Sequence, residues 1–231
     1  MNPPTKSELL FQEYCEQRLY SVEKIQTEEN KRTADFVIST PLGNVFAEVK
    51  EACPNDKERE IIQRSKQCLD IPTQEKNIGK RIRGLIDGAL GQTKNLSSLE
   101  TPCVVVLYDN IIDNGVRPFY PNFHFNYADI AFGMYGELKV TMIFDKTAEK
   151  IVETRNELGR DKKLRTDQGQ EISAVCLLLS DDAEVYPPNL YTFHNVFASL
   201  PLPLKIFRGA NDKHFRNPVK GNTFETSWIE F

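Results

Sequence analysis

The chain has 231 residues, of which 40% are hydrophobic and 27% charged, a balance that fits one sizeable α/β domain and excludes a wholly disordered chain. Its formal net charge of −4 argues against a generic nucleic-acid coat protein, although an enzyme needs only a local basic surface to bind phosphates. The sequence opens on no apolar segment and has no run of membrane-spanning length, so we expect no membrane contact and a cytoplasmic location. Five cysteines without a CxxC spacing argue against a zinc site and a disulfide framework.

An amphipathic helix is the first element that the sequence predicts. Thr5 followed by Glu8 forms the pattern of a capping box. Apolar side chains then recur at helical spacing, at Phe11, Cys15, Leu19 and Val22.

A β-hairpin is predicted next. Residues 34–38 and 45–50 are rich in β-branched and aromatic side chains, and residues 39–44 between them contain Pro, Gly and Asn. A turn centred on residues 42–43 sets Asp35 opposite Lys50 and makes Asp35 a diagonal neighbour of Glu48 on the same face. A slip of one residue would move one partner to the other face.

Three charged residues thus share one face of strands that are otherwise apolar. Buried acids are costly unless they are paired or bind a cation, so Asp35, Glu48 and Lys50 predict a metal site that activates a water. The alternative is a solvated hairpin face that carries Glu and Lys two residues apart.

The pattern of Ala34-Asp35 followed by Glu48-Val49-Lys50 resembles the PD-(D/E)XK nuclease superfamily, with Ala34 in place of the usual proline. The resemblance covers about the first 110 residues. It implies a restriction-endonuclease-like core in which Asp35, Glu48 and the Val49 carbonyl bind Mg²⁺ or Mn²⁺ and Lys50 assists the attacking water. It also implies a glutamate on the first helix near the metal, for which we select Glu13 over Glu16, although a solvent-facing role is equally compatible with helical spacing.

A second helix, over about residues 77–96, follows from the apolar stripe that runs from Ile78 to Leu90. The resemblance implies that a polar residue of this helix lies near the active site, and Gln92 is the candidate. Basic residues decorate the helix and either contact phosphate or only keep it soluble: Lys80, Arg81, Arg83 and Lys94. Residues 103–108 form a continuous apolar run that is typical of a buried central strand.

The second half carries fewer signals. Residues 138–144 and 172–179 read as strands, and the charged segment 145–170 between them predicts a mobile excursion with a short helix around 148–158. Aromatic residues between 118 and 135 either stack on bases or fill a core. His194 either contacts phosphate or is a structural histidine beside a turn.

Together these features predict an α/β protein of one domain over residues 1–231. It would have a central mixed β-sheet flanked by helices in a nuclease core over 1–110 and a C-terminal β-rich elaboration over 111–231. The expected activity is metal-dependent hydrolysis of phosphodiester bonds, with DNA as the expected nucleic-acid partner and restriction, defence or repair as the setting. A homodimer is compatible with paired cuts in duplex DNA. The alternative is a non-catalytic module of the same fold that binds nucleic acid or protein.

Overall fold

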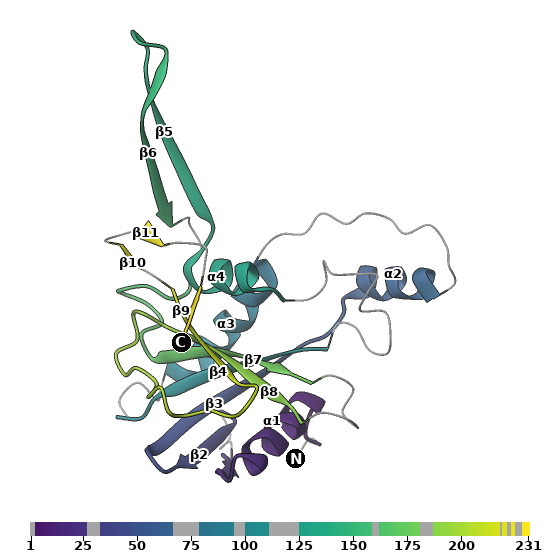
Figure 1. Cartoon of the computed structure of the whole chain (residues 1–231). Coiled ribbons are helices and arrows are strands. Elements are labelled where there is room, and N and C mark those ends of the chain that lie inside the picture. Colours follow the sequence, from purple (N-terminus) through teal and green to yellow (C-terminus); the bar gives the residue numbers. More distant parts are fainter. Residues whose placement is uncertain are drawn as a thin grey trace.

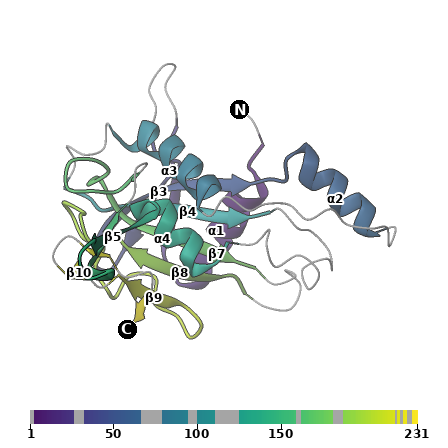
Figure 2. The same ribbon diagram turned by 90° about the horizontal axis from the view of Figure 1, so that it is seen from above.

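One eight-stranded mixed sheet forms the centre of the molecule, and helices cover both of its faces (Figures 1 and 2). The structure is a computed structural model that describes residues 3–26, 33–66, 79–94, 100–110, 125–158, 162–180, 187–217, 219–220, 223–224 and 228–231. Within these residues, no helix has the length and apolar character needed to cross a bilayer. The expected α/β class, with a mixed sheet between helices, is confirmed.

The sheet order is β1-β2-β3-β4-β7-β8-β9-β12. Its first half is built from β1 (Ser21–Lys24), β2 (Phe36–Thr40), β3 (Gly43–Ala52) and β4 (Cys103–Asp109). Its second half is built from β7 (Ile172–Leu179), β8 (Asn189–His194), β9 (Lys213–Arg216) and β12 (Ile229–Glu230). β3, β4 and β7 run parallel to one another, whereas β1, β2 and β3 form an antiparallel meander. β4 and β7 are buried and largely apolar, as expected for strands whose two faces are covered by helices, whereas β3 also carries the buried Glu48.

Helix α1 (Lys6–Gln17) begins with the predicted capping box, in which the Thr5 hydroxyl accepts from Glu8 N–H and the Glu8 carboxylate accepts from Thr5 N–H. The helix ends before Leu19, which has a φ of 57°. Leu19 N–H donates to Glu16 and Tyr20 N–H to Cys15, the Schellman pattern that normally places glycine at this position. The predicted continuation of the helical stripe through Leu19 and Val22 is therefore wrong, and Val22 belongs to β1.

The predicted hairpin is formed by β2 and β3, with a register that differs from the expected one by two residues. Phe36 pairs with Ala47 and Thr40 with Gly43, so only Pro41 and Leu42 make the turn. Continued by one residue, this register sets Asp35 opposite Glu48 rather than opposite Lys50. A shift of two leaves each side chain on its expected face because side chains alternate with a period of two.

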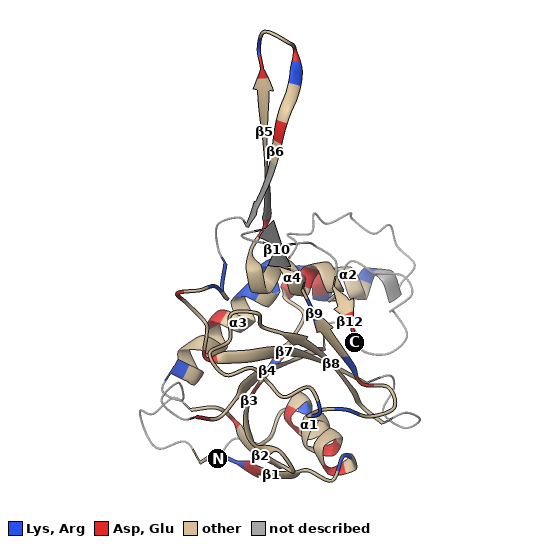
Figure 3. Cartoon of the chain, turned by 60° about the vertical axis from the view of Figure 1, so that its left-hand side comes forward, with Lys and Arg blue, Asp and Glu red and all other residues tan. Residues whose placement is uncertain are grey.

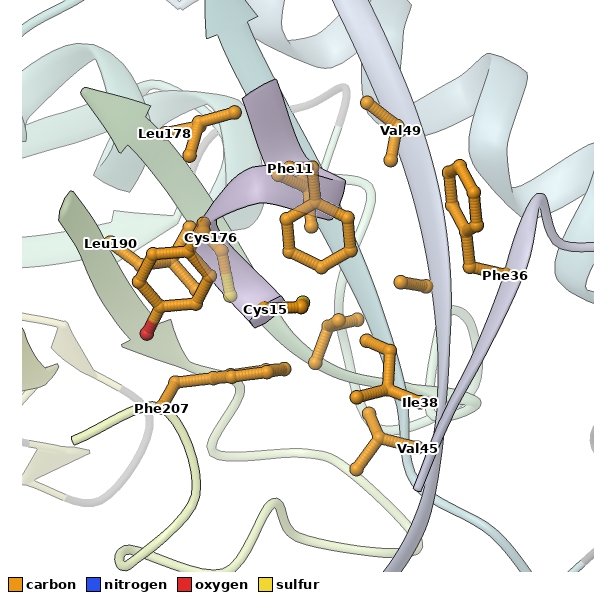
Figure 4. Packing of buried hydrophobic residues seen from close by; sticks show 14 of the residues in the cluster. Phe11, Cys15, Phe36, Ile38, Val45, Val49, Cys176, Leu178, Leu190 and Phe207 are labelled. Carbon is orange, nitrogen blue, oxygen red and sulfur yellow. The ribbon is translucent and has the colours of Figure 1, made fainter. Parts of the chain in front are cut away.

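Two hydrophobic cores lie on the two faces of the sheet. The core under α1 includes Phe11, Cys15, Phe36 and Val49, which Figure 4 shows converging between the helix and the strands. The other core lies beneath α3 (Lys80–Thr93) and α4 (Tyr127–Tyr135). Because Val49 points towards α1, its neighbours Glu48 and Lys50 point towards α3.

Helices α3 and α4 pack closely at glycine. A Cβ added to Gly133 would lie 2.3 Å from the Ile82 side chain, and one added to Gly79 would lie 2.8 Å from the backbone of Gly133. The absence of side chains at these two positions lets α3 lie against α4. This contact helps to position α3 over β3 and β4.

The remaining elements lie outside the core sheet. Helix α2 (Asp56–Lys66) follows β3, and the short strands β10 (Val219–Lys220) and β11 (Thr223–Phe224) pair with each other. Strands β5 (Leu138–Asp145) and β6 (Lys150–Leu158) form a long hairpin of their own. The predicted strand over 138–144 is confirmed, but the helix expected around 148–158 is wrong because these residues pair with β5.

Candidate active site where β2 meets β3

Asp35 is held by backbone on both sides at the point where β2 begins. Its carbonyl accepts from Ile25 N–H at 2.8 Å, and its own N–H donates to Ala47 at 3.1 Å. Its side-chain Oδ2 accepts from Val49 N–H at 2.8 Å, so the carboxylate takes a position in the hydrogen-bond ladder. The result is an aspartate with a fixed orientation beside Glu48.

Glu48 is fully buried, with 0% of its surface exposed. Its Oε2 has no hydrogen-bond partner within the described residues, whereas its Oε1 is ion-paired with Lys50. Burial first, and then the adjacent charge of Asp35, raise the pKa of Glu48 to about 7 against the opposing effect of Lys50. Burial also raises the pKa of Asp35, although the Val49 N–H and Lys50 counteract it. Two adjacent carboxylates with raised pKa values form a site whose ionised state needs a cation.

Lys50 supplies part of that positive charge. Its Nζ lies 2.5 Å from Glu48 Oε1, and it also donates to Gln92 Oε1 of α3. The Lys50 side chain keeps 23% of its surface exposed, whereas Glu48 has none. The lysine thus spans from the buried carboxylate to solvent, and Gln92 fixes its direction. The structure brings together four of the predicted residues: Asp35, Glu48, Lys50 and Gln92.

Glu13 lies elsewhere. It is exposed and accepts a hydrogen bond from Gln17, one turn further along the solvent face of α1. Of the acids in α1, Glu8 is the one whose charge adds to the raised pKa of Asp35, after the larger effect of burial. Glu8 was missed because its role in the capping box already explains it. Its spacing to Phe11 is three residues, which places it on the buried face of the helix and could have identified it.

Glu8 is itself paired with a second lysine. Its Oε1 lies 2.7 Å from Lys24 Nζ, and its Oε2 accepts from Thr5 N–H at 2.7 Å. Against the effect of burial, these contacts hold the pKa of Glu8 below its ordinary value. Glu8 is therefore a charged neighbour of Asp35 under conditions in which Glu48 takes up a proton.

The donor set suits a hard divalent cation. Carboxylate oxygens are the preferred protein ligands of Mg²⁺, and Glu48 Oε2, which has no hydrogen-bond partner within the described residues, fits this use. Val49 is placed beside both acids, with its N–H directed at Asp35 and its side chain in the core. Within the described residues, no group of three or more His, Cys, Asp or Glu side chains has the arrangement of a complete metal site.

The basic residues of α3 divide into two kinds. Arg81 Nη2 donates to both carboxylate oxygens of Glu58 in α2, at 2.6 and 2.8 Å, and the buried Arg83 pairs with Glu137 at 3.2 Å. Lys80 and Lys94 are exposed at the two ends of the helix. The two arginines therefore serve contacts between elements, and the two lysines are the cations of this helix that face solvent.

His194 is placed away from the carboxylates, three strands across the sheet on β8. It is buried, and its Nε2 lies 2.9 Å from His214 Nδ1, while His214 Nε2 donates to the Phe207 carbonyl at 3.1 Å. Burial, followed by the charge of His214, lowers the pKa of His194 to about 4. This arrangement fits the structural alternative, because a neutral histidine pair ties β8 to β9.

Comparison with known proteins adds no relative: no protein-family model, no curated protein and no solved structure matches this chain.

Proposed function

We propose that the chain is a metal-dependent nuclease of the PD-(D/E)XK type that hydrolyses phosphodiester bonds in DNA. The element order supports this: α1 is followed by the β1-β2-β3 meander, by the helices α2 and α3, and by β4, which pairs parallel to β3. Asp35 lies immediately before β2, and Glu48 and Lys50 lie within β3, an arrangement that supports the resemblance to this motif.

One observation carries the proposal. Asp35 and Glu48 are adjacent, both carry raised pKa values, and the buried Oε2 of Glu48 has no hydrogen-bond partner within the described residues. A site of this kind is unfavourable in the ionised state without a cation, and proteins keep such arrangements at functional sites. Apolar residues at the same positions would stabilise the fold more than two buried acids do, so a purely structural role does not account for them.

The side chains of the site have distinct roles in the reaction. Asp35 and Glu48 would hold Mg²⁺ or Mn²⁺, with the Val49 carbonyl as a further ligand. The bound ion would act as a Lewis acid towards the phosphate and its attacking water. Lys50, directed by Gln92 and open to solvent, orients the water and offsets the negative charge that develops on the phosphate.

The experiment compares cleavage of supercoiled plasmid by the parent and by Asp35→Ala, Glu48→Ala and Lys50→Ala variants in Mn²⁺ or Mg²⁺. Each variant should lose at least 100-fold in rate, the scale of a single electrostatic or acid–base contribution (about 10²–10⁴-fold). Glu13→Ala is the matched control, an acid removed from the exposed face of α1, and should cleave as the parent does. If all four variants cleaved the plasmid at the rate of the parent, the assignment of the site would be excluded.

A further inference from the structure

Glycine lines the side of α3 that faces solvent. Gly84, Gly88 and Gly91 follow one another at helical spacing, so they form one stripe along the helix, and all three are exposed. We call this stripe the glycine face. Glycine inside a helix is destabilising relative to alanine, so the chain sacrifices helix stability along this face.

Packing does not explain these glycines. Within the described residues, a Cβ added to Gly84 would meet nothing within 4 Å, and one added to Gly88 would meet only Lys50 Cε, at 3.9 Å, an ordinary van der Waals distance. Gly79 and Gly133 differ, because their missing side chains let α3 and α4 meet. Glycine on an exposed surface serves a purpose where a ligand must come close to the protein backbone.

The glycine face adjoins the candidate active site. The Lys50 side chain lies beside Gly88, and its Nζ contacts Gln92 of α3 and Glu48 of β3. Glu48 is fully buried, points towards α3, and has an Oε2 without a hydrogen-bond partner within the described residues. This unsatisfied oxygen is evidence, independent of the glycines, that a ligand binds at this part of α3.

The charge of the glycine face favours an anionic ligand. Lys80 and Lys94 are exposed at its two ends, and Figure 3 shows basic residues towards both ends of α3. Asp87, the one acid in the sequence of α3, is paired with Lys163 at 2.8 Å. A second copy of the same face would bring like charges together, whereas a phosphate backbone complements them.

We propose that the glycine face, with Lys80 and Lys94 at its ends, binds the sugar–phosphate backbone of the DNA strand that is cleaved. The glycines let the strand lie directly on the helix, and the two lysines bind phosphates on either side of the active site. Helix α3 has 14 residues and so spans about 21 Å, the rise of about six nucleotides of one strand. The inference rests on the proposed nuclease activity.

Gly84→Leu tests the close approach of the strand. Fluorescence anisotropy with a labelled duplex of about 20 base pairs, longer than the expected footprint, measures binding in the Asp35→Ala background, in which cleavage should be blocked. Gly84→Leu should weaken binding about 10-fold or more, the effect of losing one hydrogen bond to a charged group. It should also raise the melting temperature by about 2–3 °C, because leucine is the better helix former.

Gln17→Leu is the matched control, a leucine added to the exposed side of α1 on the opposite face of the sheet. It should bind DNA as its background does. If Gly84→Leu also bound as tightly as its background, the glycine face would not be the binding surface. A stability gain without a loss of binding would likewise overturn the inference.

Salt dependence tests the two lysines. Lys80→Gln and Lys94→Gln should each reduce the slope of log affinity against log salt by about 1, the contribution of one phosphate contact. Lys205→Gln should leave the slope unchanged, because the exposed Lys205 precedes Ile206 and Phe207 of the core under α1. An unchanged slope in both α3 variants would overturn the assignment of this surface.

The proposed activity and the proposed binding surface fail in different ways. Binding that Gly84→Leu weakens, with no cleavage by the parent in Mn²⁺ or Mg²⁺, would refute the nuclease activity but support the glycine face as a DNA-binding surface. Cleavage by the parent, with binding that Gly84→Leu leaves unchanged, would support the nuclease activity and refute the path of the strand. A parent that bound neither duplex nor single-stranded DNA would overturn the inference.

Discussion

Glu48→Gln should stabilise the metal-free protein above neutral pH while it abolishes cleavage. In the folded state, burial and Asp35 raise the pKa of Glu48 from an ordinary value of 4.5 to about 7. The contribution of this group to stability is therefore complete below about pH 4.5 and is lost as the pH rises through about 7. At pH 8.5 the parent carries the full cost of an ionised buried carboxylate.

The size of that cost follows from the pKa values. At about 1.36 kcal/mol per pKa unit, the interval from 4.5 to about 7 corresponds to about 3 kcal/mol. Glutamine removes the charge, and its amide can donate to Asp35, but Lys50 loses an ionic partner in the exchange. The net gain should therefore be about 1–3 kcal/mol, or roughly 2–10 °C in melting temperature for a chain of this size.

Urea unfolding followed by circular dichroism, with chelator present, measures this gain at pH 5.0 and pH 8.5. Glu48→Gln should match the parent at pH 5.0, where Glu48 is already largely protonated, and exceed it at pH 8.5. Glu13→Gln, at an exposed position, should match the parent at both values. If Glu48→Gln were no more stable than the parent at pH 8.5, the ionised carboxylate would not be the cost that burial implies.

Three further outcomes follow from the same contacts. Mg²⁺ affinity, measured by calorimetry, should weaken up to tenfold for each pH unit below about 7 because Glu48 must release its proton, and a flat profile would exclude Glu48 as a ligand. Gln92→Ala should lower the cleavage rate about 10- to 100-fold with the fold intact, because Lys50 loses its direction, and an unchanged rate would count against this role. Gly133→Ala should lower the free energy of unfolding by about 1–3 kcal/mol because its added methyl group clashes with Ile82. The control Gly84→Ala, at an exposed position with nothing within 4 Å of an added Cβ, should raise the free energy of unfolding by about 0.5–1 kcal/mol. Equal effects of the two substitutions would contradict the packing of α3 on α4.

The predicted elements that proved correct are those whose signal is local. The capping box at Thr5 and the apolar runs of β4 and β7 depend only on neighbouring residues. The end of α1 could not be predicted because Leu19 occupies a left-handed position where the sequence pattern expects glycine. β6 was missed because its charged residues resemble a solvated helix, and its pairing with β5 depends on strand contacts rather than on burial.

The candidate site likewise combines features that the local sequence predicts with features that depend on long-range packing. Lys50 and Gln92 are far apart in sequence, and only the packing of α3 above β3 brings their polar atoms together. The spacing of Glu8 to Phe11 indicates that both lie on one face of α1. The choice between Glu8 and Glu13 requires knowing which face of the helix is buried, and the structure shows this. The raised pKa of Glu48 depends on both burial and distance, and no pattern in the sequence gives either.

Asp35 and Glu48 nevertheless lie together although the expected register was displaced by two residues. The period of a strand explains this result, because any even displacement keeps both carboxylates on the side that faces α3, and only an odd one separates them. An even displacement changes distance instead: it turns the expected diagonal neighbours into residues directly opposite each other. Directly opposite residues have Cβ atoms about 4.5–5.5 Å apart, compared with about 7–8 Å along the diagonal. The observed register therefore brings the two negative charges closer than the sequence predicts, which is the geometry in which a shared cation stabilises them most.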